Sequence, residues 1–291
     1  MANQKEIKRR IRTVGKTQQI TSAMRMVSAA KLRRAQNAIL ALRPYSEQIW
    51  ATMYEIGRRQ PELTHPLLQV RSEPKRLEVL VIASDRGLCG AFNANVLKAG
   101  AALLAERAGQ LEQVFVSTVG RKAAEFVRRR RPLQRSWTIG QGVDMTLVRE
   151  LGAYLAGRYT SGAVDEVVVV LNEFVSALTQ RPVVVRLLPL VPEFSRVRSY
   201  AEDAGRQPFT IEPDPQRLLE VLVPQALEFT IYRGLLESQA GEHAARMTAM
   251  ESATRNTEEL IRNLTLQFNR ARQAAITKEL MEIVSGAEAL K

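Results

Sequence analysis

The sequence contains a single cysteine, Cys89, among its 291 residues. No intrachain disulfide can form, and no cluster of thiolates is available to hold zinc or an iron–sulfur centre. The two histidines, His65 and His243, lie far apart, and neither has another histidine or cysteine at ligand spacing. We therefore predict a chain without a metal or cofactor site, in a reducing compartment.

Long apolar runs and aromatic residues are also scarce. No uninterrupted apolar run approaches the roughly 18 residues that cross a bilayer, and Val167 to Leu171 is bounded by Glu166 and Asn172. Aromatic residues make up 5% of the chain, and none precedes Tyr45. With 45% hydrophobic and 25% charged residues, the composition predicts a folded chain that does not span a membrane.

Proline is absent from both ends of the chain. Residues 1–43 contain none before Pro44 and consist mostly of good helix formers, and residues 225–291 contain none at all. Each segment therefore predicts a long helix, and the second would be about 100 Å long at 1.5 Å per residue. Two such helices at opposite chain ends are expected to pair antiparallel, because neither is stable alone.

Apolar residues recur at steps of 3 and 4 in both end segments, which is typical of a coiled-coil seam. In the first segment the predicted stripe is Ile20, Met24, Val27, Leu32, Ala35, Ile39 and Leu42. In the last it is Met250, Ala253, Thr257, Leu260, Leu264, Phe268, Ala271 and Ala275, continued by Ile276, Leu280, Ile283, Ala287 and Leu290.

The middle of the chain alternates strand-like and helix-like patterns, which predicts a parallel or mixed α/β sheet. The predicted strands are Leu77 to Ala83, Gln113 to Val119, Val164 to Leu171 and Pro182 to Leu190. The predicted helices are Ala91 to Arg107, Arg121 to Arg131 and Asp144 to Arg158. The predicted fold class is thus α/β, with a long antiparallel coiled coil and a central Rossmann-like domain. The boundaries are 1–58 for the first helix, 76–207 for the α/β domain and 212–291 for the last helix.

Positive charge is concentrated at the N-terminus. The whole chain carries a formal charge of +12, and residues 1–43 hold eleven Lys or Arg and only one acid, Glu6. Such a basic helix fits an acidic partner, either nucleic acid or a protein surface lined with carboxylates. The lack of aromatic stacking platforms weakens the nucleic-acid alternative without removing it.

Two glycine-containing segments raise the alternative of a nucleotide-binding enzyme. Gly15-Lys16-Thr17 resembles the end of a P-loop, but no strand precedes it and Arg10 occupies the position of the earlier glycine. The segment from Ser84 to Gly90 follows a predicted strand and precedes a predicted helix, where doubly wound folds bind phosphate. It lacks the G-x-G-x-x-G spacing, which favours a structural or contact loop.

Four motifs together resemble the gamma subunit of F-type ATP synthases. Ile20 to Lys31 (ITSAMRMVSAAK) resembles its N-terminal helix, and Ser84 to Gly90 (SDRGLCG) the loop after its first strand. Glu212 to Pro215 (EPDP) resembles the start of its last helix, and Ile276 to Ala287 (ITKELMEIVSGA) its C-terminal signature. The resemblance runs in order from about Ile7 to Leu290.

The resemblance implies a non-catalytic subunit of the proton-translocating complex that binds no cofactor and no nucleic acid. This subunit would be the central rotor shaft, whose partners are the alpha and beta subunits of the catalytic hexamer, the epsilon subunit and the membrane c-ring. Its rotation would couple ion flow to ATP synthesis or hydrolysis at the beta subunits. The residues that the resemblance favours for coupling contacts to alpha and beta are Met24, Arg25, Cys89, Arg246, Arg272, Gln273 and Thr277.

The basic N-terminus is also typical of a transit peptide. Because the family resemblance begins inside this segment, we expect it to belong to the working protein. The expected location is the cytoplasmic face of a bacterial plasma membrane, as a peripheral part of the complex.

Overall fold

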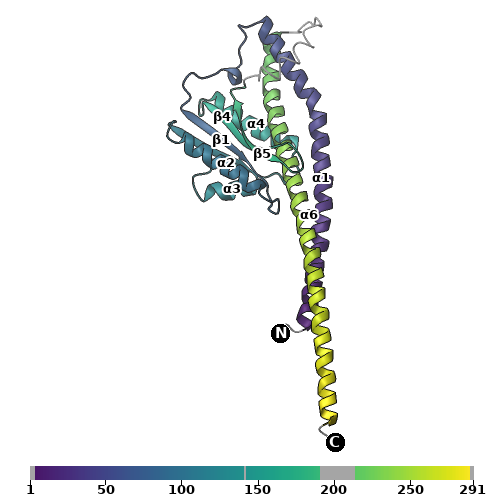
Figure 1. Ribbon diagram of the computed structural model, residues 1–291. Coiled ribbons are helices and arrows are strands. Elements are labelled where there is room, and N and C mark those ends of the chain that lie inside the picture. The colour runs from purple at the N-terminus through teal and green to yellow at the C-terminus, as the bar shows by residue number, and fades with distance from the viewer. Residues whose placement is uncertain (1–3, 141, 191–213, 289–291) are drawn as a thin grey trace. The chain divides into compact units, whose positions relative to one another are not determined.

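A computed structural model describes residues 4–140, 142–190 and 214–288 of the chain (Figure 1). The elements in order are α1 (Gln4–Arg59), the 3-10 helix η1 (Pro66–Leu68), β1 (Arg76–Ile82), α2 (Phe92–Arg107), β2 (Gln113–Val119), α3 (Arg121–Arg128), β3 (Arg135–Trp137), α4 (Met145–Thr160), β4 (Glu166–Phe174), β5 (Gln180–Leu188) and α6 (Pro215–Glu288). The chain forms two compact units, residues 1–28 with 246–291 and residues 29–245.

The five strands form one sheet in the order β3-β2-β1-β4-β5. The pairs β1–β2, β1–β4 and β2–β3 are parallel, whereas β4 and β5 form an antiparallel hairpin. The predicted α/β fold with a mixed sheet is therefore confirmed. Because the first four strands are parallel, the loops that follow them, including residues 83–91 after β1, gather at one edge of the sheet.

Alternate residues along the strands point to opposite faces and build two cores. On one face, Val79 and Val81 pack with α2 and α3, which lie together on that side (Figure 1). On the other face, Leu80 and Ile82 pack with α4 and with α1 and α6 residues of the same unit, such as Ile56 and Leu227. Both faces of the central strands are buried, which explains their nearly continuous Val, Leu and Ile sequence.

Two glycines let α6 approach the domain closely. A Cβ placed on Gly234 would lie 3.1 Å from the Leu171 side chain, and one on Gly241 would lie 3.1 Å from the ring of Phe92. These distances are tighter than ordinary contacts, so a Cβ at either position would require the neighbouring side chain to shift by a few tenths of an ångström.

The proline-free run of residues 1–43 ends at Pro44, but the first helix continues through Pro44 to Arg59. Proline lacks an amide and removes one hydrogen bond within the helix. The loss is tolerated because the turns that follow are anchored in the core by Ile49, Met53 and Ile56.

In the unit formed by residues 1–28 and 246–291, α1 and α6 run antiparallel. Gln4 Nε2 donates to the carbonyl of Ala271 at 3.2 Å, and the hydroxyls of Thr21 and Thr254 share a hydrogen bond of 2.8 Å. This pairing confirms the predicted antiparallel coiled coil. The buried positions of α1 in this unit are Ile7, Thr21 and Ser28.

The predicted seam of α1 is wrong in this unit, because Ile20 and Val27 are exposed at 60% and 56%. Thr21 and Ser28 replace them, since their hydroxyls are satisfied within the helix pair: Thr21 bonds Thr254, and Ser28 donates to the Met24 carbonyl at 2.7 Å. Leu260 of α6 is likewise exposed, whereas Met250 and Leu264 are buried as predicted.

The predicted strands and helices agree with the structure to within a few residues at their ends, but β3 was not predicted. It has three residues, of which only Trp137 is buried, too few to show an alternating pattern. At the start of α6, Asp214 accepts hydrogen bonds from the amides of Gln216 and Arg217, each at 3.4 Å. The predicted boundaries at 207 and 212, and Glu212 and Pro213 of the EPDP motif, lie outside the described residues, as does Leu290.

Candidate functional site

The seven residues predicted to make coupling contacts divide between the two units. Met24, Arg25, Arg246, Arg272, Gln273 and Thr277 all lie in the unit formed by the two helix ends, whereas Cys89 lies in the other. Arg25, Arg272, Gln273 and Thr277 are exposed, and Met24 is half-buried. Arg246 is buried, so its side chain has less freedom to move than those of the exposed Arg25 and Arg272.

Ile20 and Val27 lie on the same side of α1 as Met24, because residues three and four apart share a helix face, and both are exposed. Met26 is also exposed, at 60%, but it lies two residues from Met24 and so on another side of the helix. The replacement of apolar seam positions by Thr21 and Ser28 leaves these side chains facing outward. An exposed apolar group of this kind marks an interaction surface more often than an inert one.

A second exposed apolar group lies near the end of α6. Its described members are Ile276, Leu280, Met281, Ile283 and Val284. The contact between Gln4 and Ala271 involves the first described residue of α1. Among the described residues, α6 therefore extends past the start of α1 with apolar side chains uncovered.

The same stretch of α1 is strongly basic. All seven Lys and Arg side chains between residues 4 and 28 are exposed, namely Lys5, Lys8, Arg9, Arg10, Arg12, Lys16 and Arg25. One ion pair here is Arg10 with Glu6 at 2.8 Å, between two well-exposed side chains. The surface thus combines apolar groups with an excess of positive charge, which suits a partner that presents both apolar and acidic groups.

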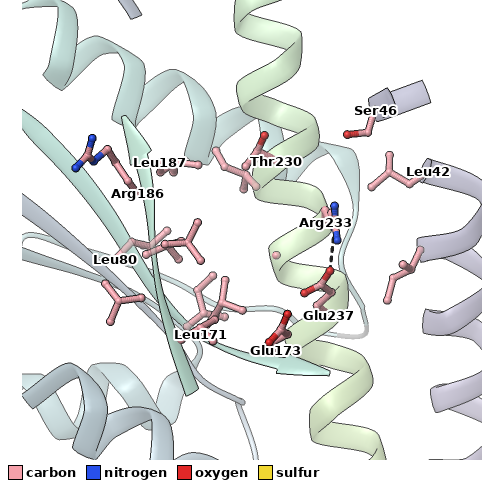
Figure 2. A pocket seen from close by; sticks show the side chains of 18 of the residues that line it. Leu42, Ser46, Leu80, Leu171, Glu173, Arg186, Leu187, Thr230, Arg233 and Glu237 are labelled. Atoms are coloured by element: carbon pink, nitrogen blue, oxygen red, sulfur yellow. Dashed lines mark hydrogen bonds and ion pairs between the residues drawn. The ribbon is translucent and has the colours of Figure 1, made fainter. Parts of the chain in front are cut away.

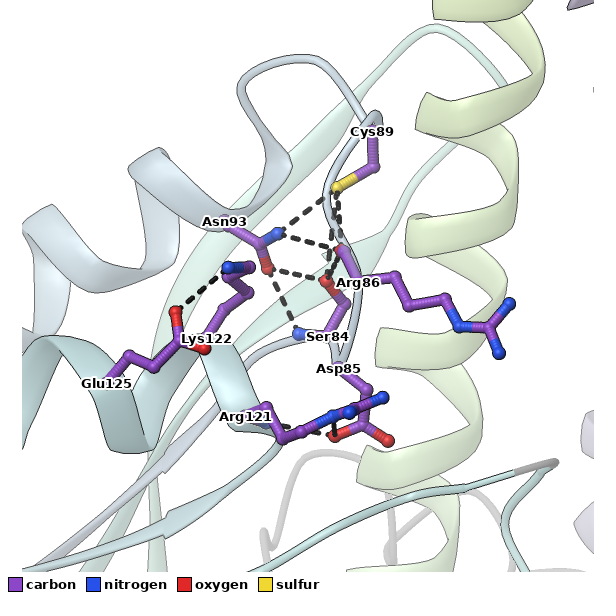
Figure 3. Close-up of polar contacts among 8 residues, drawn as sticks. All are labelled: Ser84, Asp85, Arg86, Cys89, Asn93, Arg121, Lys122 and Glu125. Carbon is purple, nitrogen blue, oxygen red and sulfur yellow. Dashed lines mark hydrogen bonds and ion pairs between the residues drawn. The ribbon is translucent and has the colours of Figure 1, made fainter.

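The loop after β1, Ser84 to Gly90, is held from inside by polar contacts (Figure 3). The Asn93 side-chain oxygen accepts from the Ser84 amide at 3.0 Å and from its hydroxyl at 2.9 Å. Asn93 Nδ2 also lies 3.2 Å from the Cys89 sulfur. The Cys89 thiol therefore points into the loop, and the residue is 2% exposed.

Leu88 is the exposed apolar side chain of this loop, at 65%, and the side chain of Arg86 is exposed as well. Its φ of +60° lies in the left-handed region, which L side chains seldom adopt. Gly90, with φ +56°, supplies a second left-handed turn just before α2. The backbone thus turns the Cys89 thiol inward and the Leu88 side chain outward.

Asp85 connects the loop to two other segments. Its Oδ1 accepts from the amide of Arg121 at 2.9 Å, and its Oδ2 accepts from the amides of Ile139 and Gly140 at 3.0 and 2.9 Å. The prediction from sequence singled out this loop but not Asp85 or Leu88. An aspartate directly after a buried strand, where helix N-termini gather, was the available signal.

The N-terminus of α3 adds positive charge beside the loop. Lys122 Nζ donates to Glu125 Oε2 at 2.9 Å, and this hydrogen bond lowers the pKa of the Glu125 carboxyl. Arg121, whose side chain is exposed, lies 4.0 Å from Asp85.

A hollow of about 830 Å³ lies within the unit of residues 29–245. It is bounded by α1, α6 and β5, with Leu80 and Leu171 of the sheet among its apolar walls (Figure 2). Its charged groups include ion pairs such as Arg233 with Glu237 at 2.8 Å and Arg181 with Glu173 at 2.7 Å. In each of these pairs a guanidinium group lies beside a carboxylate.

The first of the two glycine-containing segments is part of a continuous helix. Gly15, Lys16 and Thr17 lie inside α1 as predicted, without the turn that a phosphate site needs. Over residues 4–140, 142–190 and 214–288, no group of three His, Cys, Asp or Glu side chains is placed to hold a metal ion. No helix in this described part of the chain is long and apolar enough to cross a bilayer.

Comparison with known sequences gives matches over nearly the whole chain. The sequence model of the family described as ATP synthase matches residues 3–290. The ATP synthase gamma chain of Anaeromyxobacter sp. (strain Fw109-5) is 48% identical, and that of Pelotomaculum thermopropionicum is 43% identical. Each alignment covers 100% of both chains.

Comparison with solved structures gives the same fold. A chain of the Euglena gracilis mitochondrial ATP synthase, in a structure described as OSCP/F1/c-ring, has a TM-score of 0.64 at 19% identity. The match covers 99% of this chain and 94% of that one. A chain from the central stalk/c-ring of the Tetrahymena thermophila enzyme has a TM-score of 0.60 at 23% identity, over 80% of this chain and 99% of that one.

Proposed function

Since this chain belongs to the family of ATP synthase gamma chains, we propose that it is the non-catalytic rotor shaft of the complex. In this role it couples ion flow through the membrane ring to ATP synthesis or hydrolysis at the beta subunits. Its partners are the alpha and beta subunits of the catalytic hexamer, the epsilon subunit and the c-ring. The proposed location is peripheral, on the cytoplasmic face of a bacterial plasma membrane.

The observation that carries this proposal is the surface of the antiparallel helix pair. Its hydroxyl-lined seam leaves apolar groups around Met24 and near the end of α6 uncovered, beside a row of exposed basic side chains. Apolar contacts are non-directional, so a helix end such as Ile276 to Val284 loses little when it turns inside an apolar sleeve. Contacts between charged groups depend on the orientation of the shaft. The excess of positive charge on α1 makes the charge distribution of the helix pair asymmetric.

Coupling requires contacts that differ between the rotational states. We assign these to Met24 and Arg25 on α1 and to Arg246, Arg272, Gln273 and Thr277 on α6. The exposed arginines can reach carboxylates of beta subunits, and the guanidinium fork suits such pairs. In the loop after β1, the inward direction of Cys89 shifts the proposed contact to Leu88.

The division of labour along the chain follows from the same proposal. Residues 1–58 and 212–291 are assigned to the shaft, and residues 76–207 to the domain that meets epsilon and the c-ring. The nucleic-acid alternative loses its support, because full-length relatives at 43–48% identity are gamma chains and a basic helix alone does not select nucleic acid.

The proposal is tested by purifying the tagged chain from its own cells after nuclease treatment and detergent solubilisation. Co-elution with a ring of larger subunits that hydrolyses ATP is the expected result. Recovery of the chain alone, or with nuclease-sensitive nucleic acid, would overturn it.

A further inference from the structure

The carboxylate of Asp85 is a junction between three segments that are distant in sequence. It belongs to the loop after β1, yet its three hydrogen bonds go to the first residue of α3 and to residues 139 and 140 ahead of α4. Its side chain is 9% exposed. Each of the three bonds has a length between 2.9 and 3.0 Å, which is optimal for an N–H donor.

Other hydrogen bonds also hold the loop, among them the Lys122 amide of α3, which donates to the Ser84 carbonyl at 3.1 Å. Asn93 organises the interior by bonding Ser84 and Cys89, but Asn93 itself lies in α2, directly after the loop. Asp85 instead anchors the loop to α3 and to the segment after β3, as Figure 3 shows for Arg121. Without the Asp85 carboxylate, the loop would lose its hydrogen bonds to residues 139 and 140 and the one to the Arg121 amide of α3.

We propose that Asp85 is a positioning residue that fixes the loop of residues 84–90 so that Leu88 projects toward a beta subunit. The inference rests on the proposed rotor function and adds a specific support for one of its contacts. A force exerted on Leu88 by the contacting subunit is then transmitted through Asp85 to α3 and to residues 139–140. The loop itself does not bend.

A carboxylate is the side-chain group that suits these three partners. Both oxygens of Asp85 accept, and all three partners are backbone amides, which can only donate. In Asp85→Asn, one oxygen becomes an NH₂ group, which places a donor against at least one amide donor. Asp85→Ala removes every bond. The loop should therefore be held most firmly with Asp85, less firmly in Asp85→Asn and least firmly in Asp85→Ala.

The sole cysteine reports on the loop without any engineered label. Cys89 is buried between Asn93 and Ser84, so iodoacetamide reacts with it only when the loop opens. In the assembled complex, we expect Asp85→Asn to speed alkylation of Cys89, located by mass spectrometry, about tenfold or more. The loss of one hydrogen bond to a charged acceptor changes the opening equilibrium of the loop by about a factor of ten or more, and the alkylation rate rises with it.

Asp144→Asn is the matched control. Asp144 also accepts from a backbone amide of the same domain, that of Leu147 at 2.8 Å at the start of α4, but it does not bond the loop. We expect this variant to leave the Cys89 alkylation rate unchanged. A general loss of stability would affect both variants alike, whereas a positioning role separates them.

The coupling ratio, proton pumping divided by ATP hydrolysis in membranes, completes the test. Asp85→Asn should lower this ratio, and Asp144→Asn should not. Unchanged alkylation in Asp85→Asn would overturn the holding role, and faster alkylation with an unchanged ratio would overturn the link to coupling. Failure of the rotor function itself would appear differently, as absence of the chain from the purified complex.

Hydrogen exchange of the unmodified complex covers the case in which Asp85→Asn does not assemble. The amides of Arg121, Ile139 and Gly140 should be protected together. Rapid exchange of these three amides would overturn the proposal without any variant.

Discussion

Arg158 Nε lies 2.5 Å from Oε2 of Glu78 in the interior between β1 and α4, where Glu78 is fully buried. The second carboxylate oxygen accepts from the Ser117 hydroxyl at 2.6 Å, and the guanidinium stacks over the Phe115 ring, 4.5 Å from its centroid. A charged pair in this position is costly to desolvate, so each partner depends on the other.

Glu78→Gln should therefore reduce the free energy of unfolding by about 3–5 kcal/mol, since it leaves the Arg158 charge buried without a counter-ion. Urea unfolding of the full-length chain measures this loss. Glu166→Gln is the control, because its partner Arg186 is largely exposed and such pairs contribute about 1 kcal/mol or less. Equal losses of unfolding free energy in the two variants would show that the buried pair contributes no more to stability than the pair of Glu166 with Arg186.

Gly120→Ala should prevent stable folding of the α/β domain. Gly120 precedes α3 with φ +93°, and a Cβ there would lie 2.0 Å from the carbonyl oxygen of Ala83. The clash involves backbone at the end of β1, which cannot move aside without breaking the sheet. Expression and thermal unfolding check the prediction against Gly109→Ala, whose added Cβ meets no atom within 4 Å. A Gly120→Ala protein as stable as this control would contradict it.

Asp165 should make the domain sensitive to acid. Its carboxylate accepts from the amides of Lys75 and Arg76 at 3.1 and 2.9 Å, and from the guanidinium groups of Arg71 and Arg76. Burial alone would raise the pKa of Asp165, but the hydrogen bonds from Arg76 and Arg71 outweigh it and hold the pKa well below the usual range.

A carboxylate with a depressed pKa stabilises the fold fully above its unfolded pKa of about 3.9, and the contribution is lost as the pH falls through the folded value. Asp165→Asn should therefore be about 2–3 kcal/mol less stable than the unmodified chain at pH 7. Urea midpoints should show this difference shrinking below about pH 4. A difference that stays constant down to pH 2 would argue against the linkage.

Met24→Lys should lower the coupling ratio of the assembled complex more than it lowers ATP hydrolysis. The substitution adds a flexible cation beside Ile20 and Val27, in a stretch of α1 that is already basic. Val70→Lys places the same charge on an exposed apolar position of the other unit and serves as the control. Parallel losses of pumping and hydrolysis in Met24→Lys would indicate damage to assembly instead of coupling.

Much of the α/β domain could be predicted from the sequence, because buried parallel strands require continuous apolar runs. Val167 to Leu171 is such a run, and β4 contains it. The strand β3 was not predicted, because it has three residues and buries one of them, which leaves no alternating pattern in the sequence. The part of α1 beyond Pro44 is held by tertiary contacts of Ile49 and Ile56, which helix propensity does not contain.

The contact residues show a similar limit. A stripe chosen by hydrophobicity selected Ile20 and Val27 for the seam, whereas the helix pair buries Thr21 and Ser28, whose hydroxyls bond the Thr254 hydroxyl and the Met24 carbonyl. Likewise, no local pattern shows that Leu88 faces outward and Cys89 inward. That direction follows from left-handed backbone angles and from Asn93, which lies beyond the loop itself.

The pairing of Gln4 with Ala271 joins residues separated by 267 positions, which sets an order of events during translation. At about 5–20 residues per second, the first helix leaves the ribosome roughly ten seconds to one minute before its partner is made. Throughout that interval Ile7 and its neighbours lack the surface that will cover them. The apolar positions of α1 therefore stay exposed until α6 is made, and a premature stop codon early in α6 would leave α1 uncovered for good.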